Sequence, residues 1–202
     1  MNFLAHIYLS GVDNEIKIGN FIADDIKGSS YKKYPEKIAL GIVIHRAIDT
    51  FADSHHIYSL GKTRLTEKYG HYSGIVLDVF FDHFLALHWE KFSNQDFKAY
   101  CRNFYLSLVL HTRILTPRSR FIMPYIIIRD WLGSYVEVDN IASVLARMSH
   151  RTSLPPESNF AKKVLLENYE SYQKEFFEFM PQIIAMVEEK FKITQDYSTY
   201  LK

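Results

Sequence analysis

A chain of 202 residues is long enough for one domain with a substantial core. Hydrophobic residues make up 48% of it and aromatic residues 15%, which is typical of a well-packed globular protein. The formal net charge of +1 gives no electrostatic indication of a nucleic-acid or membrane partner. A single cysteine, Cys101, excludes an internal disulfide and fits a reducing compartment. The N-terminus lacks the basic start of a signal peptide, and no apolar run approaches the ~20 residues of a membrane span. We therefore expect a soluble, cytoplasmic protein.

Apolar residues recur at intervals of three and four along the chain, whereas strand-like alternation is scarce. This spacing predicts an all-α fold, a single-domain helical bundle of roughly seven or eight helices over residues 1–202. A further helical segment is expected between 116 and 133, interrupted at Pro124, and the last helix should kink near Pro181. The other main helices are expected, in chain order, at 15–27, 36–53, 75–90, 97–111, 140–150 and 159–192.

The segment 75–90, IVLDVFFDHFLALHWE, is expected to form a buried helix, because almost no polar face interrupts its apolar residues. Asp78 and Asp82 are four positions apart in it, so they lie one helical turn apart on the same side. Two carboxylates on an apolar helix repel each other and lose hydration, which costs several kcal/mol or forces a proton onto one of them. A divalent metal ion or an arginine would offset that cost.

Two earlier helices carry similar pairs. Asn20 and Asp24 share one face of the first helix, and His45 and Asp49 share a face of the second, where Arg46 is adjacent. A helical bundle whose inner faces supply carboxylates and imidazoles is a common way of holding Mn²⁺, Fe²⁺ or Zn²⁺. Because the set is rich in oxygen and has no cysteine, it favours Mn²⁺ or Mg²⁺ over Zn²⁺. The alternative is a buried polar network in which these groups pair with one another and with Arg46.

Four blocks of sequence have counterparts in a known family. MNFLAH at 1–6, GNFIADDIKG at 19–28, GIVIHRAIDTFADSH at 41–55 and LDVFFDHFLALHW at 77–89 resemble the acyl carrier protein phosphodiesterase family. The family is distantly related to the HD-type metal phosphohydrolases, but this chain has no adjacent His-Asp pair in that order and only the reversed Asp82-His83. The family's motif positions fall here on His6, Asn20, Asp24, His45, Arg46, Asp49, Asp78, Asp82, His83 and His88.

The resemblance implies an Mn²⁺-dependent phosphoric diester hydrolase that acts on holo-acyl carrier protein. It would cleave the bond between a carrier serine and 4′-phosphopantetheine, releasing apo-carrier and free 4′-phosphopantetheine. A metal ion would make a nucleophile available at neutral pH. We expect Arg46 to stabilise the phosphate, and His83 or His6 to act as general acid on the serine oxygen or to orient a carboxylate. The expected pool of metal ligands is Asp24, His45, Asp49, Asp78 and Asp82.

Acyl carrier proteins are small and acidic, so the resemblance also implies a basic docking surface. Lysines surround the loop that follows Asp24, and a second basic cluster lies further along the chain. The two candidate sets are Lys27, Lys32, Lys33 and Lys37, and Arg113, Arg118 and Arg120. Two rival functions remain open from the sequence. One is a metal phosphohydrolase acting on a nucleotide or another small phosphodiester. The other is a non-catalytic helical binding protein with a buried Asp/His/Arg network.

Overall fold

The computed structural model describes residues 3–150 and 152–195, and it confirms the all-α prediction because every regular element in these ranges is a helix. Among these residues there are more helices than the seven or eight expected. The elements are α1 (Phe3–Leu9), α2 (Asn14–Ile22), η1 (Ala23–Asp25), η2 (Gly28–Lys33), α3 (Glu36–Ser54), α4 (His56–Thr63), α5 (Thr66–Tyr69), η3 (Gly70–Tyr72), α6 (Ser73–Leu87), α7 (Trp89–Phe92), α8 (Phe97–Leu110), α9 (Pro117–Ile128), η4 (Gly133–Val136), α10 (Asn140–Ser149), α11 (Ser158–Glu167) and α12 (Tyr169–Phe191). None of these helices is both long and apolar enough to cross a membrane.

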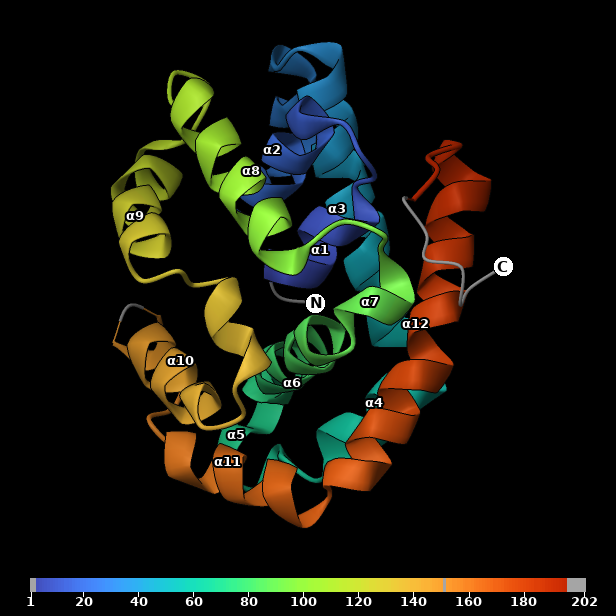
Figure 1. Ribbon diagram of the computed structural model, residues 1–202, viewed down its shortest axis with the longest axis vertical. Helices are drawn as coiled ribbons and strands as arrows, with labels where there is room; N and C mark the ends of the chain where they lie inside the picture. Colours follow the sequence, from blue (N-terminus) through green and yellow to red (C-terminus); the bar gives the residue numbers. More distant parts are fainter. Residues whose placement is uncertain (1–2, 151, 196–202) are drawn as a thin grey trace.

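Helix α6 lies near the centre of the molecule, and α1, α4, α10 and α12 pack around it (Figure 1). Its apolar residues explain that position, since Phe80, Phe81 and Phe84 are all fully buried. Each such phenylalanine contributes about 1.5–3 kcal/mol through the apolar surface that it removes from water. The C-terminal helices surround the same core, with α9 and α10 at the left of the view, α11 at the bottom and α12 at the right (Figure 1).

Helices α2 and α3 approach each other unusually closely, and two glycines allow it. A Cβ atom on Gly19 would lie 2.0 Å from the carbonyl oxygen of Ile38, and one on Gly41 would lie 2.1 Å from that of Ile16. Neither position has room for a methyl group, so the two backbones are in direct contact. This contact brings Asn20 on α2 next to His45 on α3.

The larger number of helices comes from breaks that the spacing of apolar residues did not reveal. The expected helix 159–192 is two helices, α11 and α12, separated at Asn168, whose side-chain amide donates to the carbonyl oxygen of Val164 and ends α11. Pro124 lies inside the continuous helix α9 instead of interrupting it, and Pro181 lies inside the continuous helix α12. The expected helix 75–90 is split in the same way, because α6 ends at Leu87 and a separate short helix follows.

Candidate active site

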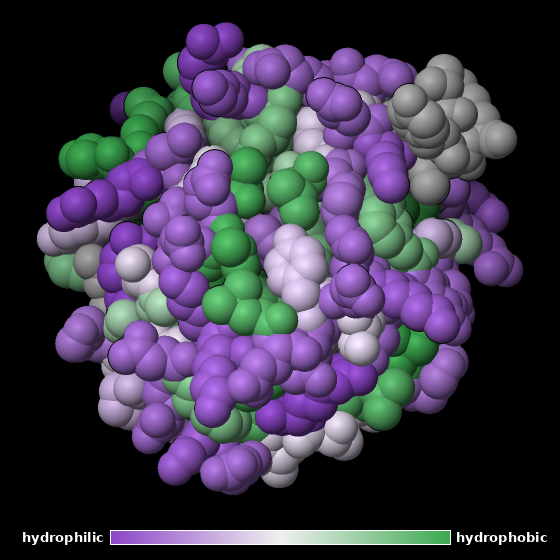
Figure 2. Space-filling model, turned by 60° about the horizontal axis from the view of Figure 1, so that its bottom comes forward, coloured by the Kyte–Doolittle hydropathy of each residue, from purple (hydrophilic) through white to green (hydrophobic). Residues whose placement is uncertain are grey.

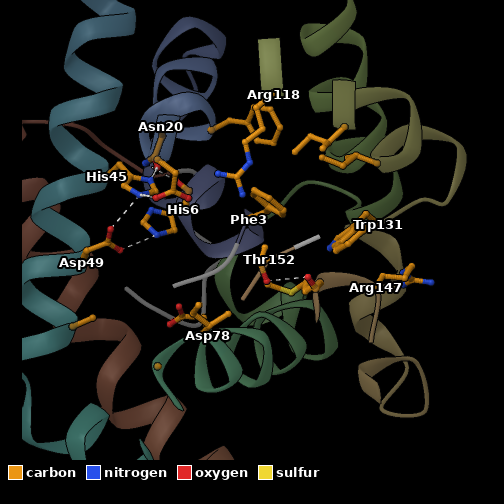
Figure 3. Close-up of a pocket in the computed structure, with 18 of the residues that line it drawn as sticks. Phe3, His6, Asn20, His45, Asp49, Asp78, Arg118, Trp131, Arg147 and Thr152 are labelled. Carbon is orange, nitrogen blue, oxygen red and sulfur yellow. Dashed lines mark hydrogen bonds and ion pairs between the residues drawn. The ribbon is translucent and has the colours of Figure 1, made fainter. Parts of the chain in front are cut away.

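A cavity of about 720 Å³ lies between the N-terminal helices and the C-terminal part of the chain. Its polar side is formed by α1, α2, η1, α3 and α6, and its opposite side by α9, α10 and the segment around Trp131 (Figure 3). The side chains on the polar side include His6, Asn20, Asp24, His45, Asp49 and Asp78. The opposite wall includes Arg118, Phe121, Ile122, Ile126, Trp131, Arg147 and Met148.

Three side chains from α1 and α3 converge at the polar end of this cavity. Nε2 of His6 lies 3.2 Å from Oδ1 of Asp49, and Nε2 of His45 lies 3.1 Å from Oδ2 of the same carboxylate (Figure 3). The two imidazole rings stack with their centroids 4.1 Å apart. One ligand atom from each residue falls within 4.8 Å of the other two, which is close enough for all three to bind one metal ion.

Asn20 fixes which nitrogen of His45 faces that cluster. The side-chain nitrogen of Asn20 donates to the carbonyl oxygen of His6 at 3.0 Å and to the hydroxyl of Ser10 at 2.9 Å. A backbone carbonyl can only accept, so the amide oxygen of Asn20 must point the other way, where it lies 2.9 Å from Nδ1 of His45. Nδ1 therefore carries a proton in either charge state of the ring, and it is Nε2 that faces the cavity, where its lone pair becomes available once the ring is neutral.

The electrostatics of the cluster call for a positive charge at its centre. Burial disfavours the imidazolium of His45, but its contacts with Asp24 and Asp49 outweigh burial and raise its pKa to about 9. Burial and the charge of His45 lower the pKa of His6 to about 3. Although Asp49 is partly desolvated, the two histidines hold its pKa below the usual range. Without a metal ion, a proton on His45 supplies the balancing charge.

His6 supplies the observation that best fits a metal ion. Both of its ring nitrogens are buried, and within the described residues neither has the geometry of a hydrogen bond, although Nε2 lies near Asp49. A buried polar atom without a partner is costly, and a cation coordinated by Nε2 would remove part of that cost. The donor set of two imidazoles and a carboxylate, all on buried or half-buried side chains, suits a first-row divalent ion.

Two other predicted ligands lie around this cluster. The carboxylate of Asp24 is mostly exposed and sits 3.2 Å from Nε2 of His45, at the mouth of the cavity. Its hydrogen bond with His45 lowers its pKa. Asp78 lines the cavity on α6 and accepts a hydrogen bond from the hydroxyl of Tyr58, while burial raises its pKa. The structure thus brings four of the five predicted ligands to one cavity.

Asp82 does not line the cavity, although it is one turn from Asp78. Its carboxylate oxygens accept hydrogen bonds from the backbone amides of Leu4 and Ala5, at 2.9 and 3.0 Å. These contacts hold the start of α1 and so place His6. Burial raises the pKa of Asp82 to about 7 despite the two amide donors. For Asp82, the free-energy cost of burying a carboxylate is therefore offset by backbone amides and not by a metal ion or an arginine.

Two predicted catalytic residues also lie elsewhere. The ring of His83 is buried between the carbonyl oxygen of Tyr135, 2.7 Å from Nδ1, and the hydroxyl of Tyr169, 2.8 Å from Nε2. Both of its nitrogens are thereby engaged away from the cavity. The guanidinium of Arg46 donates to the carbonyl oxygens of Ile26 and Gly28, at 2.6 and 2.8 Å, so it holds the turn after α2.

The arginines that do line the cavity come from the C-terminal half. Arg118 points into it from the start of α9, and Arg147 lies beside Trp131 on the far wall (Figure 3). The sequence signalled Arg118 only as part of a basic cluster, and it gave no signal for Arg147 or Trp131. The N-terminal half thus supplies the acids and imidazoles of the cavity, and the C-terminal half supplies its arginines and much of its apolar wall.

Comparison with known proteins supports the family resemblance that the four sequence blocks indicated. A family model described as acyl carrier protein phosphodiesterase matches residues 1–183. Relatives of that name include one from Yersinia pestis, 29% identical over 194 residues, and one from Serratia proteamaculans, 27% identical over 191 residues. Each alignment covers 94% of this chain and 99% of the relative. No solved structure is significantly similar to the chain. Since the family model spans most of its length, the chain belongs to the acyl carrier protein phosphodiesterase family.

Proposed function

We propose that this protein hydrolyses the phosphodiester between 4′-phosphopantetheine and the serine of holo-acyl carrier protein in a metal-dependent reaction. The products are apo-carrier and free 4′-phosphopantetheine. The observation that carries the proposal is the convergence of His6, His45 and Asp49 at the polar end of a cavity with arginines on its opposite side. Family membership supplies the substrate class, because the relatives are named for it.

His6, His45 and Asp49 would hold the metal ion, with Asp24 and Asp78 as further carboxylates at the same cavity. Mn²⁺ is the first choice, and Mg²⁺ or Fe²⁺ are the alternatives, because the donors are oxygen and imidazole nitrogen without thiolate. Such an ion would act as a Lewis acid, making a hydroxide nucleophile available near neutral pH and offsetting charge on the phosphoryl oxygens.

Side chains of the protein would bind the rest of the substrate. Arg118 faces the cavity near the ligands and carries a fixed positive charge, so it would bind the phosphate and stabilise its growing negative charge. Phe121, Ile122 and Trp131 form an apolar wall along which the pantetheine arm could lie. The cavity volume of about 720 Å³ is within the ordinary range for sites that enclose a ligand of this size.

Mass spectrometry of intact holo-acyl carrier protein tests the proposal. After incubation with the enzyme and Mn²⁺, we expect the carrier to lose the mass of phosphopantetheine, and we expect no loss when EDTA replaces Mn²⁺. The Asp49→Ala variant serves as a matched control and should leave the carrier intact under both conditions. An unchanged carrier with wild-type enzyme and any of the three candidate metals would contradict the substrate. Equal cleavage in EDTA would contradict the metal.

A further inference from the structure

The basic residues of this nearly neutral chain are unevenly distributed. Residues 97–129, which cover α8, α9 and the link between them, contain no aspartate or glutamate. The same stretch contains six basic residues, and all of them are exposed. They are Lys98, Arg102, Arg113, Arg118, Arg120 and Arg129. The two helices therefore present a positive surface in a protein whose formal net charge is only +1.

The same two helices carry most of the large hydrophobic side chains that are exposed in the described part of the chain. Ile128 is 80% exposed, Leu110 72% and Phe121 66%. The full set is Leu106, Val109, Leu110, Phe121, Tyr125 and Ile128. In Figure 2 hydrophilic residues cover most of the visible face, and hydrophobic ones appear in several groups, one of them at the upper left edge, the side on which Figure 1 places α9. Exposed apolar groups rimmed by arginine are characteristic of protein interfaces.

Helical spacing places the two kinds of residue on common faces. On α8, Arg102 is followed by Leu106 and Leu110 at intervals of four, so one basic and two apolar side chains lie along one exposed line. On α9, Phe121 and Tyr125 are again four apart, and Arg129, directly after the last residue of the helix, follows after another four. We call the exposed residues within 97–129 the α8–α9 face.

The α8–α9 face adjoins the active-site cavity. Arg118 and Phe121 belong to this face and also line the cavity. A second groove runs beside it, between Lys27 on one side and Arg113 on the other, and it meets the cavity at Asp24. A protein bound on the α8–α9 face would thus hold a flexible prosthetic group next to the candidate metal ligands.

We propose that the α8–α9 face is the docking surface for the acidic carrier protein, an inference that rests on the function proposed above. The apolar side chains provide contact area, and the basic residues attract acidic side chains of the partner. A second copy of this chain fits poorly, because a symmetric contact would oppose like charges. The lysine loop after Asp24 is less suited to be the main docking surface, since acidic residues are interspersed in it and Lys37 is paired with Asp13 at 2.8 Å. On the α8–α9 face, Arg118 is paired with Asp25 at 3.4 Å, whereas within the described residues its other five basic side chains form no ion pair.

The test compares two triple charge reversals in the full-length enzyme. The face variant is Arg102→Glu/Arg113→Glu/Arg129→Glu, which leaves the cavity-lining Arg118 untouched. The control variant is Lys68→Glu/Lys174→Glu/Lys190→Glu, which alters three exposed lysines on α5 and α12 and changes the net charge by the same amount. Steady-state kinetics with holo-acyl carrier protein, and fluorescence anisotropy of the labelled carrier, measure KM, kcat and Kd.

At low ionic strength we expect the face variant to raise KM and Kd by about tenfold or more while kcat changes by less than about twofold. The control variant should change KM and Kd by less than about twofold. Added salt should raise KM of the wild type steeply and that of the face variant only weakly. Unchanged KM in the face variant, or an equal rise in both variants, would overturn the proposal.

The binding measurement separates this proposal from the proposed function. If the wild type binds the carrier without cleaving it and the face variant does not bind, docking stands and the hydrolase function fails. If the wild type neither binds nor cleaves the carrier, both fail. If the face variant keeps its KM but no longer binds phosphatidylglycerol vesicles, or no longer dimerises in sedimentation, the face belongs to a membrane or to a second copy, and the docking proposal is wrong.

Discussion

The amide oxygen of Asn20 accepts a hydrogen bond from Nδ1 of His45 at 2.9 Å, and this contact leaves Nε2 of His45 to face the candidate metal ligands. The orientation of the amide is fixed in turn by its two donor contacts, with the backbone of His6 and the hydroxyl of Ser10. A single buried side chain on α2 thus orients a histidine on α3 and the backbone of α1, and all three helices contribute to the polar side of the cavity.

Replacing Asn20 by alanine should lower the affinity for Mn²⁺ by about 10- to 100-fold, because His45 loses the partner that sets its tautomer and orientation. Isothermal titration calorimetry of the metal-free variant measures this affinity. Ser10→Ala is the matched control, since the contact with the carbonyl of His6 still fixes the amide, and it should cost much less affinity. Equal Mn²⁺ affinity in Asn20→Ala and wild type would contradict the role assigned to Asn20.

Metal binding should depend on pH through His45. Its pKa is raised from 6.5 to about 9 in the folded, metal-free protein. The associated stabilisation is fully present below pH 6.5 and is lost as the pH rises through about 9. A metal ion on Nε2 must displace that proton, so Mn²⁺ affinity should rise with pH up to about 9 and level off above it. Calorimetry near pH 7.5 in buffers of different ionisation enthalpy should show release of about one proton per ion. Binding without proton release would contradict this assignment.

The main effect of Asp82→Ala should be a loss of stability of the folded protein. The substitution leaves the amides of Leu4 and Ala5 without their acceptor in a buried site, so we expect a loss of about 2–4 kcal/mol in the free energy of unfolding. Urea denaturation measures this loss, and Asp82→Asn, which keeps an acceptor oxygen, should lose less stability.

Asp49→Ala should instead abolish the rise in Tm that Mn²⁺ causes, with a smaller loss of metal-free stability. The reverse pattern would make Asp82 the ligand.

Arg118 and Arg46 should differ in what they affect. Arg118→Ala should lower kcat/KM for holo-carrier by about tenfold or more, because it removes a positive charge that faces the cavity. Arg46→Ala should lower Tm, because it frees the carbonyl oxygens of Ile26 and Gly28. Steady-state kinetics and thermal denaturation of both variants check this pair. A loss of turnover without a loss of stability in Arg46→Ala, with Arg118→Ala unaffected, would restore the role first predicted for Arg46.

Local spacing was enough to predict part of the site. His45 and Asp49 were expected on one helical face, and the structure brings Nε2 of His45 to 3.1 Å from the Asp49 carboxylate. The same spacing failed to predict the fate of Asp78 and Asp82, which share a helix but point to different partners. The direction of the Asp82 carboxylate depends on backbone donors that lie 77 and 78 residues away along the chain. No local pattern contains that information.

The far wall of the cavity could not be predicted for a similar reason. Trp131 and Arg147 reach it because the C-terminal helices fold back over α6, and no motif in that half of the sequence marks them. His83 shows the converse case. It lies in a block that resembles the family, yet both of its ring nitrogens contact residues of the C-terminal half, Tyr135 and Tyr169. The family motif indicated the helix that carries His83 but not the direction in which its side chain points.

The most direct test of this account is a titration of metal-free enzyme with Mn²⁺ while the release of 4′-phosphopantetheine from holo-acyl carrier protein is followed. The account predicts that activity rises from background and levels off once the cluster of His6, His45 and Asp49 is filled, and that the Asp49→Ala variant stays at background throughout. Full turnover by the metal-free enzyme, or by the variant at the same Mn²⁺ concentration, would contradict it.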